Sequence, residues 1–234
     1  DRSSAASDVY KRQTLAYPTS EGGIGVRNLE DICLAFQYKQ WWEFRTKISL
    51  WSKFLKAKYC KRANPIAKKY DTGNSLVWRY FTRNRQAVEA YIKWNIHSGS
   101  SSFWWDNWLG NEALANQVIN ISSLNNIHVS DFLTNGKWNE RYVRQHVPPT
   151  MVPEIMQTKF KYNTNIEDTA IWTPEENGKF TIASAWEVIR KKKSKDIINN
   201  SVWHKHIPFK IAFLIWRAMS CLLYTSDAAD ERSS

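Results

Sequence analysis

YIKWNIHSGSSSFWWDNWLG, residues 91–110, is the stretch on which the fold depends most. Its first seven residues alternate in polarity as a half-buried strand does. A Ser-Gly-Ser-Ser-Ser run follows, and then come bulky aromatic residues that favour a pleated surface. The pattern predicts a central, tryptophan-rich β-hairpin. Large rings bury on the order of 150–250 Å² each. We therefore expect a core that contains Trp94, Phe103, Trp104, Trp105, Trp108, Trp172, Trp186 and Trp216. A platform for stacking bases is the alternative role for the hairpin aromatics.

The part of the chain before this stretch is expected to be helical. Asn28 precedes a helical pattern that runs to about Thr46, and Ser49 precedes a second one. A third helix is predicted from Ser75 to about Ala90, with an inner set of Leu76, Val77, Phe81 and Val88. Residues 18–28 are rich in glycine and indicate a turn. A phosphate-binding loop is the weaker alternative, because no Lys-Ser/Thr follows the glycines.

The part after the central stretch alternates short elements with turns. Asn135-Gly136 is a tight-turn dipeptide, and Asn139 is placed to cap a short helix that Pro148-Pro149 ends. A second hairpin is predicted from two β-prone runs around the turn residues 174–178. The remaining expectations are irregular structure at 111–126, a short strand at 129–133, a helix at 152–160, a helix from Ala183 to about Lys193, a polar linker at 195–201 and an apolar stretch at 203–216. The fold class is α+β, in an incomplete fragment.

Composition narrows the class of protein. The net charge is +11 in 234 residues, 43% of them hydrophobic, and a positive field of this size attracts polyanions, RNA or DNA above all. A basic surface without a nucleic acid partner is the alternative. No apolar run approaches the roughly 18 residues of a membrane span, so no membrane partner is expected. Cys33 and Cys60 lack CxxC spacing, which argues against a disulfide framework and a complete zinc site.

Both ends of the chain are interpreted as translated sequencing adapter. SSAASDVYKRQ at 3–13 and CLLYTSDAAD at 221–230 can be encoded by the two strands of one short DNA. Such scars are set aside from fold reasoning, which leaves the natural segment at about 14–220, open at both ends. Cys221 is then not a candidate ligand.

Phosphate contacts are expected from a basic loop and from the outer face of the third predicted helix. The loop lies beside Tyr59 and Tyr70, and cations interleaved with aromatic rings suit a nucleic acid backbone. Arginine also offers forked donors that match phosphate. The candidate residues are Lys58, Lys61, Arg62, Lys68, Lys69, Arg79, Arg83 and Arg85. A solvated loop remains the alternative for the lysines.

Catalytic and metal sites are not expected in this chain. His204 and His206 have the spacing of two ligands on one strand, but no cysteine or carboxylate partner is evident. Asp106, beside Asn107, is either a buried carboxylate of perturbed acidity or a turn cap. The carboxylate pairs Glu167-Asp168 and Glu175-Glu176 are interpreted as solvated turns.

Four blocks occur in an order that is familiar from one family. They are EGGIGVRNLEDICLAFQYKQWW at 21–42, the central stretch at 91–110, WTPEENGKFTIASAWEVIR at 172–190 and VWHKHIPFKIAFLIWRAMS at 202–220. Over almost all of 14–220 the chain resembles plant non-LTR (LINE-type) retrotransposon reverse transcriptases. The similar region follows the polymerase core and runs into the start of the zinc-binding domain.

The resemblance implies a parent RNA-directed DNA polymerase that uses Mg²⁺ and Zn²⁺, in the nucleus or cytoplasm. This chain lacks the adjacent Asp-Asp pair of a polymerase palm, and the zinc cysteines are expected beyond residue 217. We therefore expect no cofactor here. The expected regions are adapter at 1–13, a thumb-like or connection-like helical region at 14–90, a tryptophan-rich region at 91–173, a truncated start of the zinc-binding domain at 174–220 and adapter at 221–234.

The leading functional prediction is a noncatalytic connecting region that holds RNA or DNA while an upstream polymerase does the chemistry. The alternative is a structural scaffold that packs the polymerase against the downstream zinc-binding domain and touches no nucleic acid.

Overall fold

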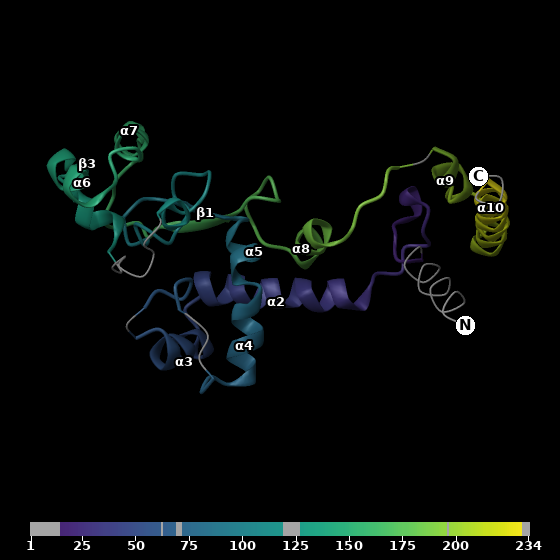
Figure 1. Ribbon diagram of the computed structural model, residues 1–234, viewed down its shortest axis with the longest axis horizontal. Coiled ribbons are helices and arrows are strands. Elements are labelled where there is room, and N and C mark those ends of the chain that lie inside the picture. The colour runs from purple at the N-terminus through teal and green to yellow at the C-terminus, as the bar shows by residue number, and fades with distance from the viewer. Residues whose placement is uncertain (1–14, 62, 69–71, 119–126, 196, 231–234) are drawn as a thin grey trace. The chain divides into compact units, whose positions relative to one another are not determined.

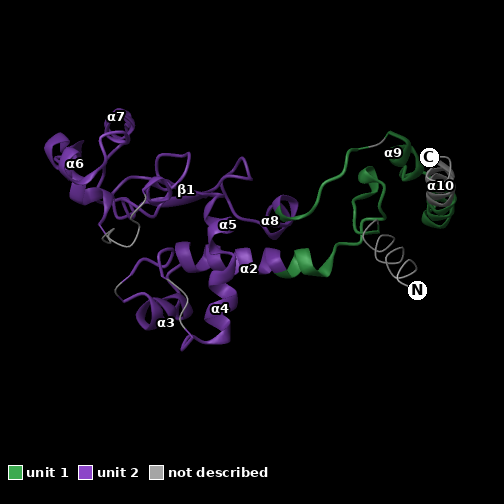
Figure 2. Cartoon of the chain, in the orientation of Figure 1, with its two compact units in different colours: residues 1–33, 189–234 green, residues 34–188 purple. Residues whose placement is uncertain are grey.

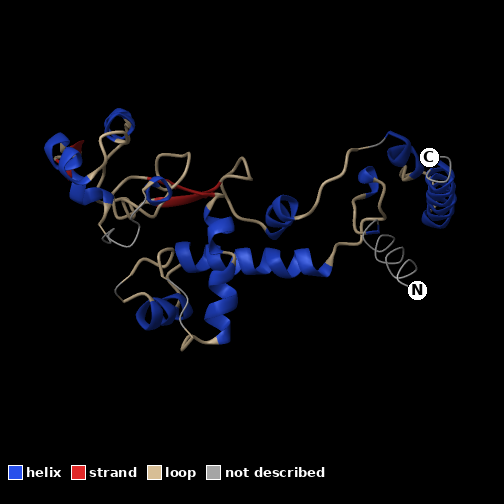
Figure 3. Ribbon diagram, viewed as in Figure 1, coloured by secondary structure: helices blue, strands red, loops and turns tan. Residues whose placement is uncertain are grey.

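The structure is a computed structural model that describes residues 15–61, 63–68, 72–118, 127–195 and 197–230. Helices dominate, and the strands form small antiparallel two-stranded sheets (Figures 1 and 3). The α+β class is therefore confirmed. Among the described helices, none combines the length and apolar character that a membrane span requires.

The chain divides into two compact units, which Figure 2 colours separately. Unit 1 comprises residues 1–33 and 189–234, and unit 2 comprises residues 34–188. The first boundary falls inside helix α2 (Leu29–Thr46), and the second falls at the end of α8 (Ile182–Ile189).

The helical start of unit 2 follows the predicted caps. Asn28 Oδ1 accepts a hydrogen bond from Glu30 N at 2.8 Å at the start of α2. Ser49 and Ser52 form a reciprocal capping box at the start of α3 (Leu50–Tyr59). Both helices begin where the sequence predicts, because a side-chain oxygen satisfies an amide that would otherwise lack a partner.

The third predicted helix is two helices, α4 (Leu76–Arg83) and α5 (Arg85–Glu89). Asn84 lies between them with φ −103° and ψ 8°, and its amide donates to Gln37 of α2 at 2.6 Å. The predicted inner set is wrong at Leu76 and Val77, which are both 63% exposed. Trp78 is buried instead, together with Phe81 and Val88.

The central stretch contains the predicted strand but not the predicted hairpin. Strand β1 (Ile92–Asn95) pairs antiparallel with β4 (Thr169–Trp172), Ile92 opposite Trp172. Residues 99–103 instead exchange backbone hydrogen bonds with residues 127–130. After them the chain turns, and Trp108 Nε1 donates to Phe103 O at 2.9 Å. The expected pairing is wrong because distant segments compete for these backbone groups.

The aromatic residues of this stretch fill the core of unit 2. Phe103, Trp104, Trp105 and Trp108 are at most 7% exposed. They pack with residues of the 3₁₀ helices η2 (Leu114–Gln117) and η4 (Val129–Phe132) and of the helices α6 (Glu140–His146) and α7 (Val152–Gln157). Trp94 is half-buried against the same cluster.

A tight hairpin and two short helices complete this part. Strands β2 (Leu133–Thr134) and β3 (Lys137–Trp138) flank Asn135 and Gly136, which both have positive φ, as a tight hairpin turn requires. Asn139 caps α6 through Tyr142 N. The strand predicted at 129–133 is η4 for its first four residues.

The turn of the second predicted hairpin forms, but the residues that follow it do not form a strand. Trp172 N donates to Gly178 O at 2.8 Å, closing the turn. The chain then enters α8, where Thr181 Oγ1 accepts from Ser184 N at 3.0 Å. The half-buried Trp186 belongs to α8, whereas the buried Trp172 belongs to β4.

Unit 1 joins the glycine-rich turn to the end of the chain. The short 3₁₀ helix η1 (Thr19–Glu21) precedes Gly22, whose carbonyl accepts from Trp216 Nε1 at 2.8 Å. Trp216 lies in α10 (Phe209–Asp230), and its cluster includes Val202 of α9 (Ile197–Val202). Because α9 occupies most of residues 195–201, the predicted linker there is wrong.

Candidate nucleic-acid interface

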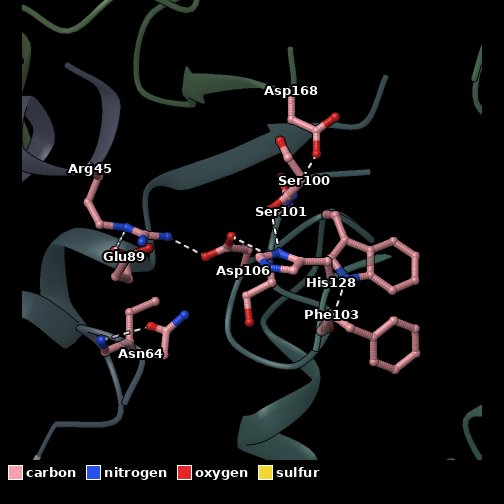
Figure 4. A network of polar contacts seen from close by, with 12 residues as sticks. Arg45, Asn64, Glu89, Ser100, Ser101, Phe103, Asp106, His128 and Asp168 are labelled. Carbon is pink, nitrogen blue, oxygen red and sulfur yellow. Dashed lines mark hydrogen bonds and ion pairs between the residues drawn. The ribbon is translucent and has the colours of Figure 1, made fainter. Parts of the chain in front are cut away.

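A buried ionic cluster organises the helical side of unit 2 (Figure 4). Arg45 of α2 lies between Glu89 of α5 and Asp106. Arg45 Nε is 2.9 Å from Glu89 Oε1, as an ion pair without hydrogen-bond geometry, and Arg45 Nη2 donates to Asp106 Oδ1. The three side chains are at most 12% exposed. The cluster therefore fixes α2, α5 and the tryptophan-rich segment to one another.

The two carboxylates have further partners. Trp41 Nε1 donates to Glu89 Oε1 at 2.7 Å, and Ser102 N donates to Asp106 Oδ2 at 2.8 Å. Burial raises the pKa of Glu89, although the Arg45 charge acts in the opposite direction. Asp106 is thus buried and accepts from a backbone amide four residues away, as a turn cap does.

Four cations act electrostatically on the thiol of Cys60, the residue that follows α3. Burial raises the pKa of the Cys60 thiol, while the charges of Lys68, Lys56, Arg45 and Arg85 act to lower it. Burial lowers the pKa of Lys56 and also that of Arg85. None of Lys56, Lys68 and Arg85 forms a salt bridge with a carboxylate in the described ranges. This cluster, Lys56, Lys68 and Arg85, is the Cys60 cation cluster.

Exposed cations and rings continue along α3. Lys58 Nζ lies 5.6 Å from the centroid of the Phe54 ring and 5.2 Å from that of Tyr59. Phe54 is 57% exposed. Tyr59 stacks on Trp78 of α4 at 4.3 Å, which joins the end of α3 to α4. Lys61, which follows Cys60, is exposed as well.

Helix α4 presents the predicted arginines. Arg79 and Arg83 are exposed and four residues apart, which places them on the same side of the helix. Arg85 lies on the separate helix α5 and is half-buried beside Cys60. The two predicted residues Arg62 and Lys69 lie outside the described residues. The charges of Lys68 and Arg85 thus both act on Cys60, whereas Lys58, Lys61, Arg79 and Arg83 are exposed.

Asp168 corrects the prediction of a solvated turn. Its Oδ1 accepts from the amides of His97 at 2.7 Å and Gly99 at 3.0 Å, and its Oδ2 accepts from Ser101 N at 2.7 Å. Burial raises the pKa of Asp168, but these hydrogen bonds outweigh it and hold that pKa below its usual range. The Ser-Gly-Ser-Ser run is therefore a backbone cradle for a carboxylate 67 to 71 residues away. The neighbouring Glu167 is exposed as predicted.

The glycine-rich turn of unit 1 surrounds an ion pair. Glu21 is 3% exposed, and Arg190 binds it in a forked geometry at 2.7 and 2.8 Å. The hydrogen bond from Arg190, aided by Lys193 N, lowers the pKa of Glu21. The glycine-rich segment therefore forms a turn, as predicted, and the carboxylate bound there belongs to this chain.

The histidines do not form a metal centre in the part of the chain that the structure describes. The rings of His204 and His206 lie 5.0 Å apart, and both residues are exposed. No group of three or more His, Cys, Asp or Glu residues that could hold a metal ion occurs among the described side chains. The described side chains therefore do not supply the three or four protein ligands that a zinc site uses.

Sequence reasoning missed the pairing roles of Arg45, Glu89, Glu21 and Asp168. Their partners are 44 to 169 residues away or belong to the backbone, so no local spacing marks them. The one local signal was an acidic residue within a tryptophan-rich run, and this signal identified Asp106 only.

Comparison with known families gives one match. Residues 180–233 match the family described as zinc-binding in reverse transcriptase. No curated protein and no solved structure matches the chain. The match supports a reverse-transcriptase-related region, in a family that binds zinc. It also extends over residues 221–233, which are interpreted above as translated adapter.

Proposed function

We propose that this chain is a noncatalytic, nucleic-acid-binding connecting region of a retrotransposon RNA-directed DNA polymerase. The parent is a plant non-LTR, LINE-type element. The observation that carries the proposal is the Cys60 cation cluster, whose three charges lack salt bridges to the described carboxylates. A phosphate backbone supplies the missing negative charge.

The surroundings of the cluster suit a nucleic acid. Surfaces that bind single strands usually combine cations, which contact the phosphate backbone, with exposed aromatic rings, on which the bases stack. Lys58 and Phe54 on α3, with Arg79 and Arg83 on α4, extend the cluster in this way. The family match supports nucleic acid as the partner class.

The chemistry belongs to other parts of the parent protein. An upstream polymerase supplies Mg²⁺-dependent nucleotide transfer, and a downstream domain supplies the complete zinc site. This chain binds the RNA or the nascent duplex.

Binding of labelled RNA and DNA to the full chain tests the proposal. We expect fluorescence anisotropy to show binding that weakens as salt increases, because phosphate contacts release counterions. Arg79→Ala/Arg83→Ala/Arg85→Ala removes up to three such contacts and is expected to weaken binding by at least about tenfold at moderate salt.

A matched variant controls for loss of net charge. Lys137→Ala/Arg141→Ala/Lys159→Ala removes the same charge from other exposed positions of unit 2. Circular dichroism checks that both variants remain folded. Equal affinities of the two variants, or no binding by the wild-type chain, would reject the proposal.

A scaffold is the second candidate function, and exposed apolar side chains favour it. Leu50 is 89% exposed on α3, and Leu76 and Val77 are each 63% exposed on α4. Exposed apolar side chains of this kind are typical of protein–protein interfaces. A chain that binds no nucleic acid but associates with the upstream polymerase would support this role instead.

A further inference from the structure

Unit 2 contains a surface hollow of about 430 Å³ between α2 and the turn that joins β4 to α8. Its volume falls within the range of about 300–1,000 Å³ that is usual for small-ligand sites. The residues that matter for its chemistry are Lys39, Trp42, Glu43, Lys47, Lys179 and Phe180. None of them belongs to the surface proposed above.

The wall formed by α2 follows from helical spacing. Lys39 and Glu43 are four residues apart on one side of α2, and Lys47 follows directly after the helix, its amide donating to Glu43 O. The opposite wall depends on Gly178, whose φ of +68° and closeness to Ile171 leave little room for a side chain. The turn at Gly178 places Lys179 and Phe180 against α2.

The hollow carries an excess of positive charge. Lys47 pairs with Glu43 at 2.8 Å, which neutralises one of the three lysines. Neither Lys39 nor Lys179 makes a salt bridge to a carboxylate within the described ranges. Two uncompensated ammonium groups therefore border the hollow and favour an anionic ligand.

Aromatic rings form the rest of the lining. The rings of Trp42 and Phe180 are nearly parallel, at 21°, with centroids 5.9 Å apart. Both residues are half-buried, and the fully buried Trp172 supports them from inside, at 6.0 Å from Trp42 and 4.8 Å from Phe180. The pair is thus a firmly held aromatic surface beside two cations.

We propose that this hollow binds one unpaired nucleotide of a single-stranded nucleic acid. The base lies against Trp42 and Phe180, and Lys39 and Lys179 bind the adjacent phosphates. A base enters only when it is unpaired, because a duplex keeps its base faces stacked. This inference rests on the proposed function and adds a preference for single strands to it.

The first test compares two double variants of the full chain. Lys39→Ala/Lys179→Ala should bind a fluorescein-labelled oligouridine or oligothymidine about tenfold more weakly than wild type, with the salt slope reduced by about 1.4, since each lost single-strand phosphate contact contributes about 0.7. The control Lys137→Ala/Lys159→Ala should bind as wild type does. A duplex probe should respond to neither substitution. Equal affinities of the two variants for the single strand would overturn the inference.

The second test locates the base. An oligonucleotide with 5-iodouracil at one position should, on irradiation, cross-link to peptides that contain Trp42 or Phe180, as mass spectrometry of the digest would show. Cross-links confined to other peptides would overturn the inference.

The two proposals fail in different ways. Weak binding by the triple arginine variant, with normal binding by Lys39→Ala/Lys179→Ala, removes the nucleotide hollow and leaves the proposed function intact. Absence of binding by the wild-type chain removes both.

Discussion

Arg45 is a side chain whose removal should lower stability strongly. Arg45→Met would leave Glu89 and Asp106 buried without their cation. Breaking a buried pair in this way costs about 3–5 kcal/mol. We expect urea unfolding to show a loss of that size in the free energy of unfolding.

Arg144→Met is the matched control. Arg144 pairs with Glu140 at 2.7 Å, but the two side chains are 64% and 57% exposed. An exposed pair four residues apart on a helix contributes about 0.3–0.5 kcal/mol. Similar losses in the two variants would show that Arg45 does not hold the helices together.

Asp168 should make the stability of unit 2 depend on acid. Its pKa is lower in the folded chain than in the unfolded one, so its contribution is present above the unfolded pKa and is lost as pH falls through the folded pKa. Asp168→Asn lacks this carboxylate and should be less stable at neutral pH by about 1–3 kcal/mol.

Unfolding curves of wild type and Asp168→Asn between neutral pH and about pH 3 provide the measurement. The difference between the two proteins should shrink toward acid, whereas the exposed Glu167→Gln should differ little from wild type throughout. A constant difference across this range would contradict the role of the backbone cradle.

At the residue scale, a hydrogen bond or ion pair could be predicted from the sequence when its two partners are close along the chain. The caps at Ser49 and Asn139 bond to amides three residues away, so the sequence sufficed. Arg45 and Asp106 are 61 residues apart, and nothing local indicates their pairing. The phosphate contacts stay predictions from charge and residue type, whereas which of these cations act on Cys60 depends on tertiary packing.

At the scale of elements, the loop at 98–101 is held by close approach to η4. Gly99 has φ +76°, and a Cβ there would lie 2.8 Å from Ser130 N. Gly99→Ala should therefore destabilise the chain by about 1–3 kcal/mol, through strain and overlap.

Gly73→Ala is the control, because a Cβ at Gly73 meets nothing within 4 Å. We expect its midpoint of thermal unfolding to change little or to rise slightly, since alanine restricts the unfolded chain. Equal effects at the two glycines would contradict the packing of the loop on η4.

The elements themselves were predicted better than their pairing. Helices α2, α3, α6 and α7 lie where periodicity and caps place them. Strand β1 was recognised from its alternation, but its partner β4 is some 77 residues further along the chain. A local turn signal such as Ser-Gly-Ser-Ser favours a hairpin, and the long-range competition from Asp168 that defeats it has no local signature.

At the scale of the whole molecule, the net charge of +11 means that cations outnumber the carboxylates that could pair with them. In the described ranges the buried cations Arg45 and Arg190 have carboxylate partners inside the fold. The Cys60 cation cluster does not, and Lys39 and Lys179 do not either. The internal pairs stabilise the units, and the remaining charge is available for a polyanion.

The most direct test is the salt dependence of RNA binding by the full wild-type chain. If the Cys60 cation cluster, α3 and α4 contact at least four phosphates, a plot of log affinity against log salt should have a slope of about −3 or steeper. An affinity that does not change with salt, or no measurable binding at low salt, would contradict the account.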